Sequence, residues 1–192
     1  MRKFDPSDEK LLLAIARRSI ERAVGRGAGP AEPAAPVPDT LAKPAAAFVT
    51  IHEHGELRGC IGLMRFETPL WLNVKEAAAA AAMDDPRFLP VSEPELPALE
   101  LEVSVLDPPV EIPGYTGFVA GRHGIIVERG GHRALFLPQV ATEMGWNETQ
   151  MLDAVCRKAN LPTDAWRDPA TRLLIFESVA FSESGLAAGP AE

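Results

Sequence analysis

Two hairpin patterns constrain the fold of this chain more than any other feature of its sequence. Segments 46–64 and 124–138 each carry two runs rich in aliphatic and β-branched residues, joined at His54-Gly55 in the first and at Gly130-Gly131 in the second. Glycine supplies the positive φ that a two-residue turn needs. Because helical patterns separate the hairpins without a regular βαβ alternation, the sequence predicts an α+β fold with an antiparallel sheet flanked by helices.

Apolar residues at helical spacing predict the remaining elements. Thr68 and Pro69 are suited to the N-cap and first helical position of one helix. Asn147 and Gln150 stand in capping-box positions before another. The expected helices lie within residues 5–25, 68–85, 138–146 and 147–161, and two further strands are expected at 99–106 and 171–183.

The chain of 192 residues is long enough for one hydrophobic core, and we expect a single domain over residues 1–192. Proline, glycine and alanine dominate the segment 26–40, which predicts a flexible loop. Small residues at 184–192 predict a frayed tail.

Composition excludes several classes of protein. The formal charge is −8 and no window gathers a basic face, which argues against nucleic-acid binding because phosphate neutralisation supplies most of that affinity. The alanine-rich run 76–83 is far too short to span a bilayer, so no membrane association is expected. Two cysteines 96 positions apart, Cys60 and Cys156, make no disulfide framework, and we expect reduced thiols and a cytoplasmic location.

Several short motifs together identify a resemblance. In chain order the motifs are "LRGCIG" (57–62), "DPRF" (85–88), "LEVSVL" (101–106), "LPQVA" (137–141), "GW" (145–146) and "CRKANLP" (156–162). With them the chain strongly resembles the AMMECR family, whose prokaryotic members are called AmmeMemoRadiSam system protein A; the resemblance covers roughly residues 6–183.

The resemblance implies an α+β fold whose larger part is built from both terminal regions around an antiparallel sheet, with a smaller subdomain from the middle of the chain. It also implies that genes for a Memo-like protein and a radical-SAM protein accompany the gene of this protein in genomes. It implies no particular reaction. No phosphate-binding loop, GxGxxG or nucleophile-elbow motif is present, so the cofactor remains unassigned and the sequence does not decide whether the protein is an enzyme.

Cys60, inside "LRGCIG", is the candidate catalytic residue, and two interpretations remain open. A nucleophilic cysteine needs a cation or a base beside it, which Arg58 and a distant His123 or His132 are candidates to supply. Alternatively, Cys60 is a small side chain in a tightly packed strand. With a two-residue turn at His54-Gly55, His52 is expected to face Leu57, Ile51 to face Arg58 and Val49 to face Cys60. This register places His52 on the opposite side of the sheet from Cys60.

Four further residues complete the candidate binding site. Gly59 and Gly62 leave the strand bare, so that a ligand or partner backbone can approach closely. Arg58 and Arg87 offer forked donors suited to carboxylate or phosphate groups. The alternative is that the glycines accommodate the alanine-rich helix and that neighbouring acids, Asp84 or Asp85 among them, neutralise the arginines.

The cluster "HEH" at His52, Glu53 and His54 resembles a metal-ligand set. A strand sends Glu53 away from both histidines, His54 falls in the expected turn, and no third ligand is evident nearby. We therefore predict no metal site there.

Two functions from different classes follow. The first is an accessory or interaction protein acting beside Memo-like and radical-SAM partners. The second is a thiol-dependent enzyme that uses Cys60 on a small anionic substrate.

Overall fold

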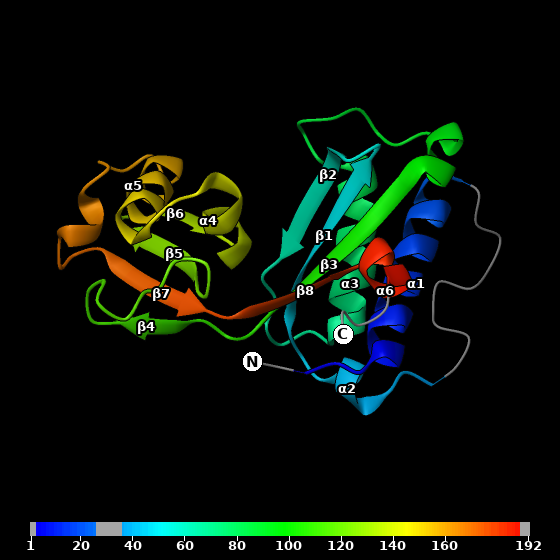
Figure 1. Cartoon of the computed structure of the whole chain (residues 1–192), viewed down its shortest axis with the longest axis horizontal. Coiled ribbons are helices and arrows are strands. Elements are labelled where there is room, and N and C mark those ends of the chain that lie inside the picture. Colours follow the sequence, from blue (N-terminus) through cyan, green and yellow to red (C-terminus); the bar gives the residue numbers. More distant parts are fainter. Residues whose placement is uncertain (1–2, 26–35, 189–192) are drawn as a thin grey trace. The chain divides into compact units, whose positions relative to one another are not determined.

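The computed structural model describes residues 3–25 and 36–188, and their strands form two antiparallel sheets (Figure 1). The predicted α+β fold is confirmed. The elements are α1 (Pro6–Ala23), α2 (Asp39–Ala42), β1 (Ala46–Glu53), β2 (Glu56–Leu63), α3 (Leu70–Met83), the 3₁₀ helix η1 (Glu93–Ala98), β3 (Leu99–Leu106), β4 (Val110–Ile112), β5 (Gly124–Arg129), β6 (His132–Phe136), α4 (Pro138–Met144), α5 (Glu148–Lys158), the 3₁₀ helix η2 (Ala165–Arg167), β7 (Arg172–Phe176), β8 (Ser178–Ser182) and α6 (Glu183–Ala188).

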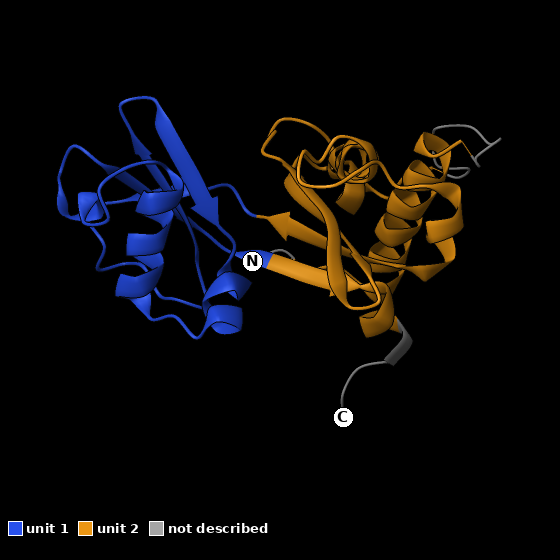
Figure 2. Ribbon diagram, turned by 90° about the horizontal axis from the view of Figure 1, so that it is seen from above, with its two compact units in different colours: residues 1, 107–178 blue, residues 2–106, 179–192 orange. Residues whose placement is uncertain are grey.

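The chain divides into two compact units (Figure 2). One unit contains residues 2–106 and 179–192 and holds a sheet with the strand order β2-β1-β3-β8. The other contains residues 107–178 and holds a sheet with the order β4-β7-β5-β6. The larger unit is therefore built from both ends of the chain, and the smaller one from its middle.

In the larger unit, α1 and α3 lie along one face of the sheet (Figure 1). Alternate strand residues such as Val49, Ile51 and Leu101 point to these helices and are fully buried. The alanines of α3 allow it to approach the strands closely, with Ala77 and Ala78 also fully buried. This face therefore forms the core, and the other face carries the polar strand residues.

In the smaller unit, α5 packs against β5 and β6. The predicted capping box is confirmed, because Asn147 Oδ1 accepts from the Gln150 N–H at 3.0 Å and Gln150 Oε1 accepts from the Asn147 N–H at 3.0 Å. The predicted turn at Gly130-Gly131 is also present, with positive φ at both residues. Ile125, Val127, Met151 and Leu152 belong to the core of this unit.

Several predicted elements differ from the structure. The single strand expected at 171–183 is two strands, β7 and β8, which belong to different sheets and are separated by Glu177. The predicted tail at 184–192 was wrong over residues 184–188, because α6 runs through them and Glu183, its first residue, binds Arg17 of α1. Residues 189–192 lie outside the described part.

Two boundaries also differ. The helix expected to begin at Pro69 begins one residue later, because Pro69 is extended with ψ 137° and serves as the N-cap in place of Thr68. Within the predicted loop 26–40, residues 26–35 lie outside the described residues, and Asp39 begins the short helix α2.

Candidate functional site

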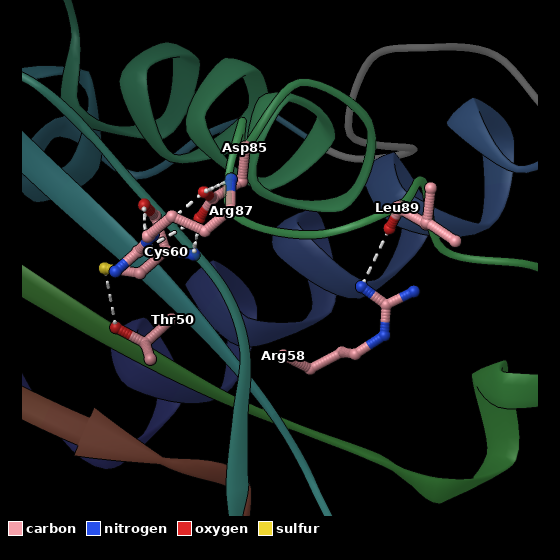
Figure 3. A network of polar contacts seen from close by, with 6 residues as sticks. All are labelled: Thr50, Arg58, Cys60, Asp85, Arg87 and Leu89. Carbon is pink, nitrogen blue, oxygen red and sulfur yellow. Dashed lines mark hydrogen bonds and ion pairs between the residues drawn. The ribbon is translucent and has the colours of Figure 1, made fainter.

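The loop at residues 85–91, which we call the clamp loop, binds the outer edge of β2 (Figure 3). β2 is an edge strand, and the backbone of Cys60 points away from the sheet. Its N–H donates to Asp85 Oδ2 at 2.9 Å, and its carbonyl accepts from Arg87 Nη2 at 3.3 Å. These bonds satisfy backbone groups that an edge strand otherwise offers to another chain.

Asp85 is the buried centre of this contact, with only 2% of its side chain exposed. Its carboxylate accepts from Arg87 Nε at 2.9 Å and from Arg87 Nη2 at 2.7 Å, in addition to the Cys60 N–H. The hydrogen bonds from the Arg87 guanidinium, with those from the two backbone N–H groups, hold the pKa of Asp85 well below its usual range although burial opposes this. Asp85 therefore remains ionised and tied to both the strand and the loop.

Arg58 fixes the other end of the clamp loop. Its Nε donates to Glu95 Oε1 at 2.7 Å. Its Nη1 donates to the carbonyl of Leu89 at 2.9 Å, as Figure 3 shows. Hydrogen bonds from Arg58 and Ser92 lower the pKa of Glu95 to about 2. Since the Arg58 side chain is only 15% exposed, its positive charge is committed to this internal network.

The two arginines of the predicted binding site are therefore both engaged with acids of the same chain. Arg87 is the more accessible, with 53% of its side chain exposed, and it binds Asp85 through two nitrogens. An anionic ligand would have to compete with Asp85 and Glu95 for these guanidinium groups.

The two glycines lie on opposite faces of β2, and each is covered from within the larger unit. A Cβ at Gly59 would lie 2.3 Å from the backbone oxygen of Ala81 in α3. A Cβ at Gly62 would lie 2.1 Å from the ring of Phe48. The bare backbone of Gly59 thus accommodates α3, and that of Gly62 accommodates an aromatic ring on the neighbouring strand.

The predicted register of this hairpin is correct only next to the turn. His52 faces Leu57 as expected, but Ile51 faces Gly59 and Thr50 faces Cys60, so the expected pairs Ile51–Arg58 and Val49–Cys60 were wrong. The physical reason is a β-bulge in which Arg58 is an extra residue. A bulge shifts the register by one and moves all later side chains to the other face.

The bulge places Cys60 on the face that carries Thr50 and His52, away from α1 and α3. Thr50 Oγ1 lies 3.3 Å from Cys60 Sγ and donates a hydrogen bond to it (Figure 3). Cys60 is half-buried. His52 and Cys60 therefore share one side of the sheet, contrary to the prediction from an unbulged register.

The residues of the "HEH" motif are separated by the hairpin. His54 occupies the turn with φ 53°, and Gly55 follows with φ 84°. His52 lies on β1, opposite Glu100 of β3. Among residues 3–25 and 36–188, no three His, Cys, Asp or Glu side chains gather in an arrangement that would hold a metal ion.

The other candidates for thiol chemistry lie in the unit formed by residues 107–178. His132 begins β6, and His123 precedes β5 with its Nδ1 accepting from the Val119 N–H at 3.1 Å. Cys156 is fully buried on α5, and burial raises the pKa of its thiol.

Sequence reasoning missed Thr50 as the partner of the Cys60 thiol and Asp85 as the partner of its backbone. Asp85 was considered only as a neutraliser of Arg87. A glycine inside a strand, as at Gly59, often marks a bulge, and this signal was available in the sequence. No local pattern connects Asp85 to Cys60, which are 25 residues apart.

No helix in the described part of the chain combines the length and the apolar character needed to cross a membrane. The sequence model of the AMMECR1 family matches residues 13–181.

Similar proteins occur in archaea. A protein of Methanothermobacter thermautotrophicus is 43% identical over 182 residues, which cover 92% of this chain and 94% of that protein. Protein TK0174 of Thermococcus kodakarensis is 40% identical over 184 residues, with coverages of 91% and 89%. The crystal structure of the uncharacterized protein PH0010 from Pyrococcus horikoshii superposes with a TM-score of 0.89 at 37% identity and covers 100% of this chain and 98% of that one. The chain belongs to the AMMECR1 family.

Proposed function

We propose that this protein is an accessory component that binds partner proteins through the clamp loop and the adjoining edge of β2. The observation that carries the proposal is the exposure of Leu89. Its side chain is 83% exposed, although its backbone carbonyl is held by Arg58 at 2.9 Å. An apolar side chain displayed on a rigid segment is suited to the apolar, fully buried core of a protein interface.

Rigidity of this surface favours recognition. Asp85 and Arg58 hold both ends of the clamp loop, so little conformational entropy is lost when a partner covers it. Leu57, 41% exposed on the strand itself, adds a second apolar contact on β2. The family resemblance identifies the partners we propose, a Memo-like protein and a radical-SAM protein, acting together in the cytoplasm.

The experiment measures binding of the purified chain to each of these two proteins from the same organism by titration calorimetry. Leu89→Glu places a charge at the proposed anchor and should weaken binding at least tenfold. Met144→Glu is the matched control, because Met144 is also an exposed apolar residue, 57% exposed, in the other unit. Circular dichroism checks that both variants fold.

Two results would contradict the proposal. If neither partner binds the wild-type chain, the partners are wrong. If Leu89→Glu and Met144→Glu bind as the wild type does, the surface is wrong.

A second candidate function is thiol-dependent catalysis by Cys60 on a small anionic substrate. The hydrogen bond from Thr50 to Cys60 Sγ favours it, because a donor to sulfur stabilises a thiolate. The shared face of Cys60 and His52 also brings a base to the same side of the sheet.

Alkylation of the native protein at a series of pH values tests this candidate. A thiol-dependent enzyme requires Cys60 to react as a thiolate well below pH 8, and Thr50→Val should slow the reaction. Labelling of Cys60 that rises only above pH 8 and is unchanged by Thr50→Val would exclude it.

A further inference from the structure

A groove of about 540 Å³ lies between α1 and α6 in the larger unit, and we call it the α1 groove. α6 lies beside α1, where Glu183 binds Arg17 (Figure 1). The α1 residues that line the groove follow the i, i+4, i+7, i+8 spacing of a single helical face. They are Pro6, Lys10, Leu13, Ala14 and Arg17, and α6 contributes Glu183 and Leu186. Because a helix rises roughly 16 Å from Pro6 to Arg17, the groove is elongated.

The charges at the Arg17 end of the groove are paired with each other. Arg17 donates from Nε to Glu183 Oε1 at 3.1 Å and from Nη2 to the other oxygen of the same carboxylate. Its Nη1 donates to the Leu96 carbonyl at 3.1 Å, and its Nη2 also donates to the Leu99 carbonyl at 2.7 Å. The Glu183 carboxylate accepts in addition from the Leu101 N–H at 3.0 Å. This guanidinium and this carboxylate are therefore held by the larger unit itself and leave no net charge for a ligand.

Lys10 differs from Arg17 because its charge has no partner. In the part of the chain that the structure describes, its ammonium makes no hydrogen bond and no ion pair. Among the described residues that line the groove, Glu183 is the only acid, and Arg17 already matches its charge. The side chain of Lys10 is exposed and has a flexible four-carbon stem, so its ammonium can turn toward a molecule in the groove. The groove thus offers one uncompensated positive charge.

The acids of the first turn of α1 do not neutralise Lys10. Asp5 is the N-cap and accepts from the Asp8 N–H at 2.8 Å and from the Ser7 hydroxyl at 2.6 Å. Asp8 and Glu9 precede Lys10 by two residues and one residue, and side chains at these spacings do not face each other on a helix. The positive charge of Lys10 is therefore available to an anion.

The stretch of the groove between Lys10 and Arg17 is apolar. Leu13 is buried there, and Leu186 of α6 is half-buried and packs against the same core. Ala14 is half-buried and has only a methyl group, which leaves the groove open at this point. Along the helix axis the distance from Lys10 to Arg17 is about 10 Å, so the apolar stretch is long and narrow. A groove of this size and lining is suited to a small organic molecule.

We propose that the α1 groove binds a small linear carboxylate, with the carboxylate on the Lys10 ammonium and an unbranched aliphatic chain over Leu13, Ala14 and Leu186. The charge of Lys10 selects the anionic group, and the elongated apolar stretch selects an unbranched chain. This site involves no residue of the clamp loop or of β2, so its test and the test of partner binding are independent of each other.

The experiment uses the full-length chain and three probes, octanoate, hexanoate and hexanamide, in NMR titrations at pH 7.5. Octanoate should shift the backbone resonances of Lys10, Ala14 and Leu186. It should bind about tenfold more tightly than hexanoate, because two more methylene groups are buried. Hexanoate should bind about threefold more tightly than hexanamide, since an exposed ion pair adds only a small contribution.

Two variants separate the parts of the site. Lys10→Met keeps an apolar stem without the charge, so it should weaken hexanoate about threefold and leave hexanamide unchanged. Lys43→Met is the matched control, because Lys43 is also an exposed lysine of the larger unit but lies outside the groove. Ala14→Phe places a ring in the apolar stretch and should weaken octanoate at least tenfold. Circular dichroism checks that all three variants fold.

Three outcomes would overturn the proposal. The first is the absence of shifts at Lys10 and Ala14 at 20 mM octanoate. The second is equal binding of octanoate and hexanoate, or of hexanoate and hexanamide. The third is octanoate binding that is unchanged in both Lys10→Met and a folded Ala14→Phe.

Discussion

The carboxylate of Asp85 accepts a hydrogen bond from the backbone N–H of Cys60 at 2.9 Å, across 25 residues of chain. The same carboxylate binds the Arg87 guanidinium, which in turn donates to the Cys60 carbonyl. A single buried side chain thus fixes the backbone at the centre of the "LRGCIG" segment.

Asp85→Ala should lower the free energy of unfolding by about 2 kcal/mol, because it leaves the Cys60 N–H without its acceptor at a buried site. Asp85→Asn retains a side-chain oxygen for that N–H and should cost less. Urea denaturation at pH 7 measures both, with Asp84→Asn, an exposed neighbour, as the control. Equal stability of Asp85→Ala and the control would contradict the assigned role.

The stabilisation by Asp85 should depend on pH in a defined direction. Its pKa in the folded protein lies below the ordinary value of about 3.9 that applies to the unfolded chain. Such a group contributes its full stabilisation above that unfolded value and loses it as the pH falls further. The stability difference between wild type and Asp85→Asn should therefore be constant from pH 7 to about pH 5 and shrink below about pH 4, as followed by urea denaturation.

Gly59→Ala should destabilise the larger unit more than Gly62→Ala does. The added methyl group at Gly59 meets the backbone of α3, which cannot move without shifting the helix. At Gly62 it meets the side chain of Phe48, which has rotamers to adopt. We expect a loss of about 3 kcal/mol for Gly59→Ala and about 1 kcal/mol for Gly62→Ala, measured by thermal unfolding. The reverse order would show that the ring of Phe48 is the more rigid contact.

Cys156 should be inert toward alkylating reagents in the native protein. It is fully buried, and burial raises the pKa of its thiol. Its labelling rate should follow unfolding of the unit at 107–178 and rise with urea, whereas half-buried Cys60 should react without urea. Mass spectrometry of labelled peptides distinguishes the two sites, and native labelling of Cys156 at the rate of Cys60 would contradict the packing described for α5.

Local patterns were sufficient where one chain segment determines its own conformation. The glycine turns of both hairpins, the strand at Leu99–Leu106 and the cap at Asn147 are of this kind, because turn geometry and capping depend on neighbouring residues. The α+β class followed from their order along the chain.

Features that depend on distant segments were not predictable from such patterns. The bulge at Arg58 is a different case, because Gly59 signals it locally and the register was predicted without it. The run of apolar residues at 171–183 is continuous, and only tertiary structure divides it between two sheets. The candidate site also depends on a distant segment. Arg58 is neutralised by Glu95 of η1, and no local pattern connects these two residues.

The path of the chain through Glu177 has a consequence for how this family can change. The chain leaves β3 after Leu106 and enters β8 at Ser178, and β3 and β8 are neighbours in one sheet. Where the chain enters and leaves, the Asp107 N–H donates to the Glu177 carbonyl at 2.9 Å, so the two ends of the inserted unit meet. Topologically the unit is an insertion between two adjacent strands, and we expect changes in its length to leave the strand order of the host sheet intact.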